Sequence, residues 1–418
     1  MNARAHESAP GWLFVLPWSL RHTGGVNEVV KSLIIEFRSD GTYCPYLLCA
    51  PDDSMITDPD LINPLFLDFW SPVDHEKPLR GWISFIARLP HRCWTMRKII
   101  RRDKIRVINP HFPDLGALSF LILKKIKLFN GELILSFHLS DIKASQSAQG
   151  VERWLWRILL RGADSIVAVS DDSGANILRL DPSIAKKLVT IRNGVDLALF
   201  SSSDAAATAQ HLAPGHEKTV LSVGAFIPRK GHDVLVRAFD LLLQTVPDAR
   251  LTIVGGDGSE FEPLGRLIDS LGLNDKIRLC KDVPHDQIPA FLSQSQLFVL
   301  ASLQEGHPLA VVEAGAAGLP IVCTQGAWSQ ELITDGLTGR LFAQGDERAL
   351  AAAMADLFTN NKEARQMAAR FHEYVKKNLT WEHSYKKYLQ LGGEAAGRFP
   401  RANMPSTSDA CVVEKTAP

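Results

Sequence analysis

Two glutamates stand eight positions apart in a stretch that is otherwise almost entirely apolar or small, EGHPLAVVEAGAAGLPIVCT (305–324). A carboxylate in such surroundings loses its hydration and needs a compensating partner. Glu305 and Glu313 could therefore act as buried hydrogen-bond acceptors. Carboxylates are good acceptors for the hydroxyl groups of sugars.

The local sequence predicts where each glutamate lies. Segment 296–302, QLFVLAS, is typical of a buried strand. Pro308 suits the first position of a helix, where its missing N–H costs nothing, and Gly318 is a typical helix end. Glu305 is thus expected in the loop before the helix and Glu313 more than one turn inside it. At helical rise the two are about 12 Å apart.

The start of this helix lies between the two carboxylates. Free backbone N–H groups are expected there, from His307 to Ala310, and such a helix terminus binds phosphate well. The order carboxylate, anion site, carboxylate matches the sugar hydroxyls, diphosphate and ribose hydroxyls of a nucleotide sugar. Solvated helix carboxylates would give the same spacing, but the apolar surroundings of Glu313 argue against that alternative.

Alternating strand and helix patterns must position this site. Such alternation indicates parallel sheets covered by helices on both faces, so the predicted fold class is α/β with two doubly wound, Rossmann-like domains. Ligands of such sheets bind at the carboxyl ends of the strands, and the crevice between the domains is the expected active site. The predicted strands are 11–18, 44–50, 105–111, 131–138, 164–170, 187–194, 218–226, 249–256, 276–283, 296–302 and 319–324.

Length and composition set broad limits. A chain of 418 residues is too long for one ordinary core, and 46% hydrophobic and 22% charged residues are typical of a globular protein. The net charge of zero says nothing about partners, and no nucleic-acid partner is expected. Six scattered cysteines without a C-x-x-C pair predict neither a disulfide framework nor a zinc site. The apolar run at 11–18 suits a buried strand better than a signal peptide. No apolar stretch is long enough to span a membrane.

One segment departs from this neutral balance. Residues 77–127 carry 13 lysines and arginines against two aspartates. Within them, 78–102 mixes aromatic and aliphatic residues with arginines. Two interpretations stay open: peripheral contact with an anionic membrane surface, or a solvated helix with one core face. The first would suit an acceptor carried on a lipid.

The stretch around the two glutamates resembles the E-x7-E signature of glycosyltransferase family 4, a retaining family with the GT-B fold. The resemblance extends over about residues 11–390 and is more specific in the second half. Further motifs similar to the family's are VLSVGAFIPRKGHDVLVRAF (220–239), LTIVGGDGSE (251–260), ELITDGLTGRLF (331–342), LTWEHSYKKY (379–388), GGVNEVV (24–30), ADSIVAVSDDS (163–173) and IRNGVDLALF (191–200).

The resemblance implies a division of the chain. Residues 1–205 would form an acceptor-side domain and 206–378 a nucleotide-sugar-binding domain, with the small polar segment 201–215 as the junction. Residues 379–395 would form a helix that packs back on the first domain. Residues 396–418 lack periodicity and are expected to be a disordered tail.

The resemblance also implies roles within the signature. Glu313 would bind the ribose of the donor, and Glu305 would contact the transferred sugar. His307, Pro308 and Leu309 would lie against the diphosphate. Because Pro308 has no N–H, the donors there must be its neighbours.

Cations are expected beside the diphosphate. The family usually has an arginine after the glycine that ends the first strand of the second domain, but here Ala225 stands in that place. Lys230 matches the family's lysine, and Arg229 precedes it. Both types suit a diphosphate, so Lys230 is expected to contact the phosphates. Replacement of the missing arginine by Arg229 stays open, as does a surface role for Arg229.

Three further candidates come from the first half. Gly24 and Gly25 follow the first strand, where glycines let the backbone approach a ligand closely; an ordinary tight turn is the alternative. His138 ends a predicted strand at the position where family members often have a histidine beside the sugar. Its alternative is a polar residue with no ligand role.

The implied reaction moves a sugar from a nucleotide-diphosphate donor to an acceptor hydroxyl with retention, and Glu305, His138 and Lys230 are the candidate catalytic residues. The sequence offers no convincing nucleophile for a double displacement. A front-face route is expected, in which the helix terminus and Lys230 stabilise the leaving diphosphate. No cofactor and no dedicated metal are expected, because no D-x-D motif stands in a suitable place.

The acceptor would be a glycan or a lipid-linked molecule, in polysaccharide, lipopolysaccharide or glycolipid biosynthesis. The expected location is the cytoplasm or the inner face of the cytoplasmic membrane. Two alternatives stay open: a nucleotide-sugar epimerase or sugar phosphorylase on the same fold, and a non-catalytic subunit that binds the nucleotide sugar. A dinucleotide dehydrogenase is disfavoured because no G-x-G-x-x-G follows the first strand.

Overall fold

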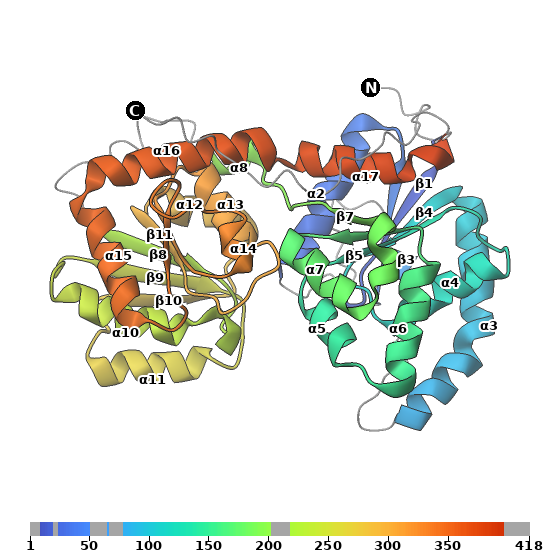
Figure 1. Ribbon diagram of the computed structural model, residues 1–418, viewed down its shortest axis with the longest axis horizontal. Coiled ribbons are helices and arrows are strands. Elements are labelled where there is room, and N and C mark those ends of the chain that lie inside the picture. Colours follow the sequence, from blue (N-terminus) through green and yellow to red (C-terminus); the bar gives the residue numbers. More distant parts are fainter. Residues whose placement is uncertain (1–8, 20–23, 51–64, 67–77, 202–217, 397–418) are drawn as a thin grey trace.

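A computed structural model describes residues 9–19, 24–50, 65–66, 78–201 and 218–396. Two α/β domains lie side by side, and the helices α16 (Asn361–Asn378) and α17 (Trp381–Ala396) run along both of them (Figure 1). Apart from Ser201 and Ala396, the predicted junction and the predicted tail lie outside the described residues. Ala396 itself is the last residue of α17, not part of a tail.

The first domain is built on a seven-stranded parallel sheet in the order β3-β2-β1-β4-β5-β6-β7. Its strands are β1 (Gly11–Val15), β2 (Cys44–Cys49), β3 (Leu65–Phe66), β4 (Ile105–Pro110), β5 (Glu132–Phe137), β6 (Ser165–Ala168) and β7 (Leu188–Thr190). Its helices are α2 (Gly25–Asp40), α3 (Pro78–Arg102), α4 (Leu118–Lys125), α5 (Ser140–Ser147), α6 (Gly150–Gly162) and α7 (Asp171–Leu180). The short α8 (Leu197–Phe200) follows in the chain and lies against the second domain (Figure 1).

The second domain has a six-stranded parallel sheet in the order β10-β9-β8-β11-β12-β13. Its strands are β8 (Thr219–Val223), β9 (Arg250–Gly255), β10 (Ile277–Lys281), β11 (Leu297–Leu300), β12 (Ile321–Thr324) and β13 (Arg340–Phe342). Its helices are α10 (His232–Leu243), α11 (Phe261–Leu271), α12 (Ile288–Ser293), α13 (Leu309–Ala316), α14 (Ala327–Gln330) and α15 (Glu347–Thr359).

Both sheets reverse their strand order beside their first strand, between β1 and β4 and between β8 and β11. Ligands of doubly wound sheets bind outside the carboxyl ends of the strands at such a point. The predicted α/β class and the two parallel sheets are confirmed. All predicted strands are present, each of them one to four residues shorter at one or both ends. The sequence analysis missed the edge strands β3 and β13, which have only two and three residues.

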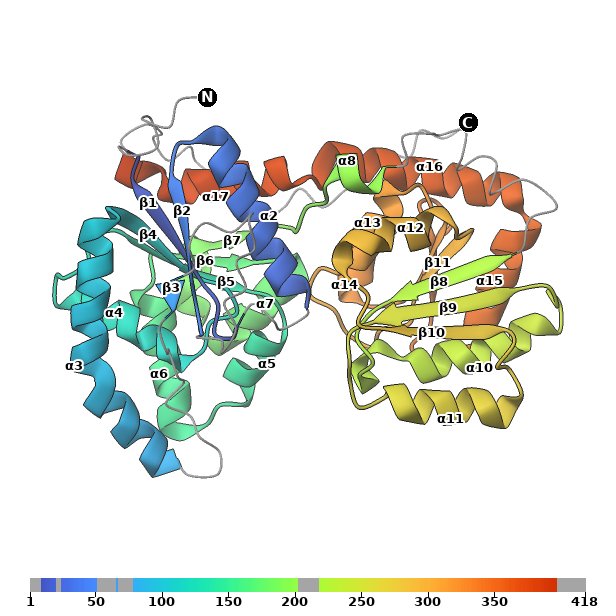
Figure 2. The ribbon, with the colours of Figure 1, turned by 180° about the vertical axis from the view of Figure 1, so that it is seen from behind.

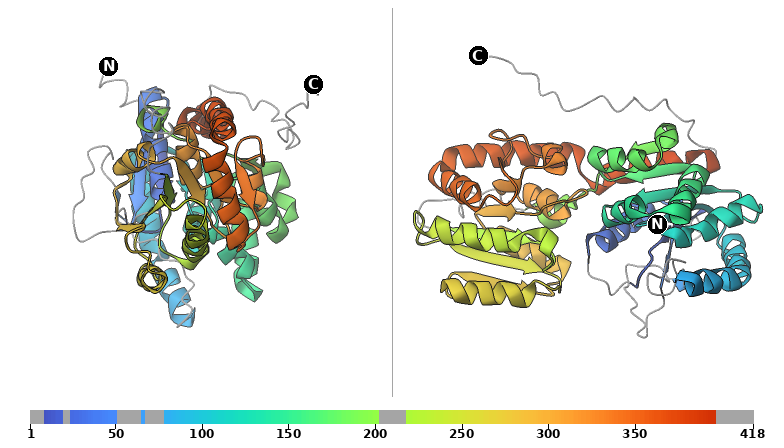
Figure 3. Two further views of the ribbon diagram at one scale, coloured as in Figure 1. Left: turned by 90° about the vertical axis from the view of Figure 1, so that its left-hand side faces the viewer. Right: turned by 60° about the horizontal axis from the view of Figure 1, so that its bottom comes forward.

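Apolar side chains cover both faces of each sheet. In α2, Val29, Leu33 and Phe37 lie on one side of the helix and are buried. α17 returns from the second domain and packs on α2, as the view from behind shows (Figure 2). The Tyr388 hydroxyl of α17 lies 3.0 Å from the Ser136 hydroxyl of β5. The α16–α17 pair therefore joins the two domains, which the remaining views also show (Figure 3).

Candidate functional site

The switch point of the second sheet brings two cations onto Glu305. The 3-10 turn Pro228–Lys230 follows β8, while Glu305 follows the neighbouring strand β11. The Lys230 Nζ lies 2.6 Å from Glu305 Oε1, and the Arg229 Nη1 lies 3.1 Å from Glu305 Oε2. Strand order thus brings together three of the residues that the sequence had singled out.

Close backbone packing holds this turn in place. Gly231 adopts a left-handed conformation with φ 61°, and a Cβ there would overlap the carbonyl oxygen of Ala301 at the end of β11. The Lys230 side chain lies over Gly224, where a built Cβ would be 3.1 Å from the lysine Cδ. Arg229 also donates to the Gln304 carbonyl oxygen at 2.7 Å. A glycine after β8 and another after Lys230 therefore leave room for the lysine to reach Glu305.

The carboxylate of Glu305 is ionised despite its burial. The residue is only 6% exposed, and burial alone would raise its pKa. Lys230 and Arg229 outweigh that effect and hold the pKa of Glu305 below its ordinary value. Two cations face one carboxylate, so the cluster has a net charge of +1. A site with that charge beside a helix start is suited to a diphosphate.

Glu313 has a different partner. It lies on α13 and is 4% exposed, which confirms that it does not reach bulk water. Its Oε1 lies 2.7 Å from Nε2 of His285, a residue in the loop that follows β10. α13 begins at Leu309, one residue later than predicted, because Pro308 has the extended conformation of a helix cap with ψ 113°.

His138 follows β5 in the first domain and belongs to a buried polar chain. Its Nε2 lies 3.1 Å from His111 Nδ1, and His111 Nε2 lies 3.1 Å from Asn109 Oδ1. The Asn109 amide N–H groups are used by the Ile134 carbonyl and the Ser136 hydroxyl, so Oδ1 is the acceptor. His111 then donates through Nε2 and His138 donates to His111. The Nδ1 of His138 is left as an acceptor.

Burial fixes the charge of this pair. It lowers the pKa of His138 to about 3 and holds the pKa of His111 well below its ordinary value, with His138 adding to the latter effect. Both rings are therefore neutral at ordinary pH. A neutral His138 with a free Nδ1 lone pair can accept a hydrogen bond from a hydroxyl group.

The carboxyl edges of the two sheets meet at the signature loop. A Cβ built on Gly306 would overlap the carbonyl oxygen of His138. The Asn193 Nδ2 donates to the His307 carbonyl oxygen at 3.0 Å. Gly25, at the start of α2, lies close to Leu309, since a built Cβ would be 3.5 Å from the leucine Cδ1. The glycine turn, His138 and the start of α13 are thus neighbours.

His307 carries an unexpected feature. The residue is 6% exposed, and neither nitrogen of its ring has a hydrogen-bond partner among the described residues. Burial, together with the charge of Arg192, lowers its pKa to about 3. Its backbone carbonyl is engaged by Asn193, so the imidazole is a neutral polar group available to a ligand.

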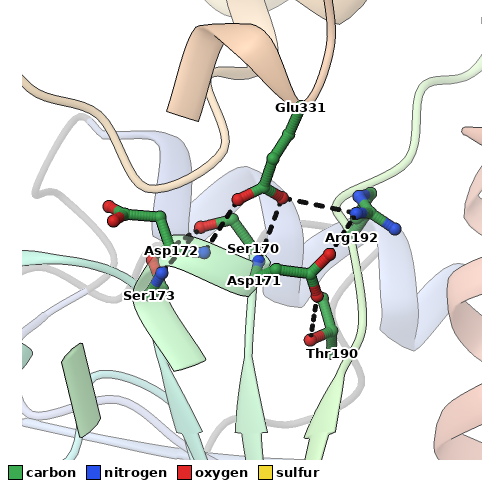
Figure 4. A network of polar contacts seen from close by, with 7 residues as sticks. All are labelled: Ser170, Asp171, Asp172, Ser173, Thr190, Arg192 and Glu331. Atoms are coloured by element: carbon green, nitrogen blue, oxygen red, sulfur yellow. Dashed lines mark hydrogen bonds and ion pairs between the residues drawn. The ribbon is translucent and has the colours of Figure 1, made fainter. Parts of the chain in front are cut away.

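A second contact between the domains was missed in the sequence. The Glu331 carboxylate, which follows α14, accepts hydrogen bonds from the backbone N–H groups of Asp171 and Asp172 at the start of α7 (Figure 4). Arg192 bridges Glu331 and Asp171 at 3.3 and 2.9 Å. Thr190 donates to Asp171 at 2.6 Å. A carboxylate of one domain therefore caps a helix of the other, where the helix dipole favours negative charge.

The missed residues share one signal. His285, Arg192 and Glu331 each lie in a segment that follows a strand of one of the two sheets, on the edge where ligands of such sheets bind. Their position after a strand could have identified them as candidate site residues. It could not have shown which residues meet, because each contact joins distant parts of the chain.

Comparison with known families agrees with this arrangement. The sequence description of the family "Glycosyltransferase Family 4" matches residues 23–199, and that of "Glycosyl transferases group 1" matches residues 204–377. Two parallel Rossmann-like sheets with facing carboxyl edges define the GT-B class of fold. The chain belongs to glycosyltransferase family 4. The first description matches its first domain, and the second description matches its second domain.

Individual relatives are more distant. The GDP-mannose-dependent alpha-(1-6)-phosphatidylinositol monomannoside mannosyltransferase of Mycolicibacterium smegmatis is 30% identical over 174 residues, which are 40% of this chain and 45% of that protein. The match thus spans less than half of that relative's length.

Among solved structures, sucrose-phosphate synthase from Thermosynechococcus elongatus gives a TM-score of 0.74 at 22% identity, with 93% of this chain and 99% of that chain covered. Anabaena HepE in complex with UDP-glucose gives 0.70 at 17% identity, with 92% and 99% covered. These likenesses concern the fold.

Proposed function

We propose that this protein transfers a sugar from a nucleotide-diphosphate donor to an acceptor hydroxyl, with retention at the anomeric carbon. The observation that carries the proposal is the cluster of Glu305, Lys230 and Arg229 beside the start of α13. Its net charge of +1 suits the diphosphate, while Glu305 is placed to accept hydroxyl groups of the sugar. Glu313, more than a turn further along, is placed for the ribose.

The carboxyl edge of the first domain's sheet, which faces the signature loop, supports a front-face route. The first domain presents the His138 backbone carbonyl to Gly306 and a neutral imidazole with one free lone pair. Both are hydrogen-bond acceptors, suited to hydroxyl groups of the sugar or the acceptor. The leaving diphosphate takes the proton of the acceptor hydroxyl, and Lys230 stabilises its charge. Because Lys230 and Arg229 supply that positive charge, the proposal includes transfer without a dedicated metal.

A thermal-shift panel tests the donor site directly. UDP, GDP, ADP and their sugar conjugates are added to the protein, and a bound nucleotide raises the unfolding temperature by mass action. The solved relative HepE binds UDP-glucose, so a UDP sugar is the first candidate. A shift with one nucleotide class supports the proposal, and absence of any shift would contradict it. Product analysis with the active donor then separates transfer from epimerisation and phosphorolysis.

For the acceptor we propose a lipid-linked molecule at an anionic membrane surface, in glycolipid or cell-surface polysaccharide biosynthesis. Helix α3 buries Phe85, Met96 and Ile100, so it has the core face that the alternative interpretation, a solvated helix, required. Its outer face is not simply polar, because Ile83, Ile86 and Trp94 on that face are 61%, 63% and 55% exposed.

Basic side chains flank these exposed apolar residues. Arg80, Lys98 and Arg101 share the outer face, and the Lys98 Nζ lies 3.3 Å from the centre of the Trp94 ring. On α6, Trp154 is 60% exposed. Mixed basic and apolar faces of this kind bind anionic lipid surfaces. The relative from Mycolicibacterium is named for a phosphatidylinositol-linked acceptor. In the described part of the chain, no helix is long and apolar enough to cross a membrane.

Liposome flotation tests the membrane proposal. Vesicles with anionic lipid are expected to retain the protein at low salt, and the double variant Lys98→Glu/Arg101→Glu is expected to abolish retention. Lys376→Glu/Lys377→Glu on α16 makes the same charge change on exposed lysines of the other domain and serves as the matched control. Equal retention of both variants by the vesicles, or no retention of the wild type, would contradict the proposal.

A further inference from the structure

One imidazole connects the ribose end of the site to the other domain. His285 lies 2.7 Å from Glu313 through Nε2 and 3.3 Å from Glu28 Oε2 through Nδ1. Glu313 belongs to α13 of the second domain, whereas Glu28 belongs to the first turn of α2 in the first domain. The His285 side chain is 33% exposed, so the contact lies at the margin of the interface.

The chemistry of the two partners sets the state of the ring. The Nε2 contact to Glu313 is a hydrogen bond, and a carboxylate oxygen accepts, so Nε2 carries hydrogen, while the ion pair of Nδ1 with Glu28 favours a hydrogen on Nδ1 as well. Burial alone would lower the pKa of His285, but Glu313 and Glu28 outweigh it and raise the pKa above its ordinary value, with Lys31 acting against them. The Phe200 ring, 5.5 Å from the imidazole between ring centres, is an uncharged neighbour.

The same hydrogen bond orients Glu313. His285 uses Oε1, which leaves Oε2 and the second lone pair of Oε1 for the two hydroxyl groups of a ribose. We propose that His285 is a positioning residue for the donor: it fixes the Glu313 carboxylate for the ribose and links that carboxylate to the first domain through Glu28. This inference rests on the donor site proposed above.

A consequence for pH follows. As the pH rises through the pKa of His285, the ring loses one N–H and can serve only one carboxylate. Glu313 then loses its fixed donor or the link to Glu28 breaks. Loss of one charge-assisted hydrogen bond corresponds to an affinity change of about tenfold. Donor affinity is therefore expected to fall on the alkaline side of pH 6.5 through this residue, in addition to any effect of the nucleotide's own ionisation.

The expected pH dependence is tested by measuring the Kd of UDP or GDP, whichever gives the larger thermal shift, by calorimetric titration from pH 6 to 9. The ratio of the Kd of His285→Gln to that of the wild type cancels the titration of the nucleotide. This ratio is expected to be about ten at pH 6 and to approach one at pH 9.

A second variant tests the link to the first domain. In Glu28→Gln the imidazole keeps its contact to Glu313 but loses a carboxylate that raises its pKa, so the midpoint of the pH profile shifts to lower pH. Glu36→Gln, on the same helix without a contact to His285, is the matched control and should leave the midpoint unchanged.

The outcomes separate the two proposals. If the wild type binds the nucleotide but the His285→Gln ratio is the same at every pH, His285 has only a structural role and the inference is overturned while the donor site stands. An unmoved midpoint in Glu28→Gln overturns the link to the first domain. If the wild type binds neither nucleotide, the proposed function and this inference fail together.

Discussion

The two ends of the glutamate signature are alike in sequence and burial but differ in their partners. Glu305 is 6% exposed and is held by Lys230 and Arg229, both from its own domain. Glu313 is 4% exposed and is held by His285, whose pKa Glu313 and Glu28 raise above its ordinary value against the effect of burial and which also contacts the other domain. The sugar end is therefore a fixed electrostatic site, and the ribose end is one that pH and domain approach can change.

The largest effect is expected at the fixed end. Lys230→Ala removes the cation closest to Glu305 and the one expected to stabilise the leaving diphosphate. Turnover should fall about 100- to 1,000-fold, the range found when one donor to a developing charge is removed. Steady-state kinetics with the active donor measure it. Lys218→Ala, whose partner Asp248 is 3.5 Å away on the surface of the same domain, is the matched control and should keep full activity.

A smaller loss, of a different kind, is expected from Glu305→Gln. The amide keeps the shape but leaves Lys230 and Arg229 without a counter-charge, and its contacts to the sugar weaken. We expect kcat to fall about 10- to 100-fold through the loss of one charged hydrogen-bond acceptor. Unchanged turnover would mean that Glu305 does not act in the reaction.

At the ribose end, Glu313→Gln should act on binding. The amide can still accept a hydrogen bond, but it is no longer the charged partner of His285. The donor KM is expected to rise about tenfold with kcat little changed. A fall in kcat at constant KM would mean that Glu313 acts in the chemical step, and the division between the two ends would be wrong.

The smallest effect concerns stability. The lowered pKa of Glu305 stabilises the folded state above its ordinary value of 4.5, and this contribution is lost as the pH falls through the lower folded value. The raised pKa of His285 stabilises below 6.5, and this contribution is lost as the pH rises through the higher folded value. Urea unfolding at a series of pH values should show that Glu305→Gln differs least from the wild type in acid and His285→Gln least in alkali. The reverse order would contradict both assignments.

Much of this site could be read from the sequence because its parts are local. The strand, turn and helix around Glu305 and Glu313 follow from apolar runs, a proline and a glycine within 23 residues, 296–318. The sequence also placed Glu305 and Lys230 after strands of one doubly wound sheet, but their direct contact is seen only in the structure. Ala225 stands where the family usually has an arginine, and Arg229, whose role the sequence left open, contacts the Glu305 carboxylate.

The contacts between domains could not be predicted in this way. His285 with Glu28, and Glu331 with the start of α7, depend on how the two domains meet, and no local pattern encodes that. The acceptor nitrogen of His138 likewise depends on a chain through His111 and Asn109 that only packing of β4 against β5 creates. The edge strand β13 was missed because three residues are too few to show a period.

The central claim is that one nucleotide-diphosphate sugar lies across both ends, with its ribose on Glu313 and its sugar on Glu305. Titration calorimetry of the unconjugated nucleoside diphosphate into three proteins tests it most directly. The account predicts that Glu305→Gln binds at least as tightly as the wild type, because the cations gain net charge, while Glu313→Gln binds about tenfold more weakly. Equal affinity in all three proteins, or a larger loss in Glu305→Gln than in Glu313→Gln, would contradict it.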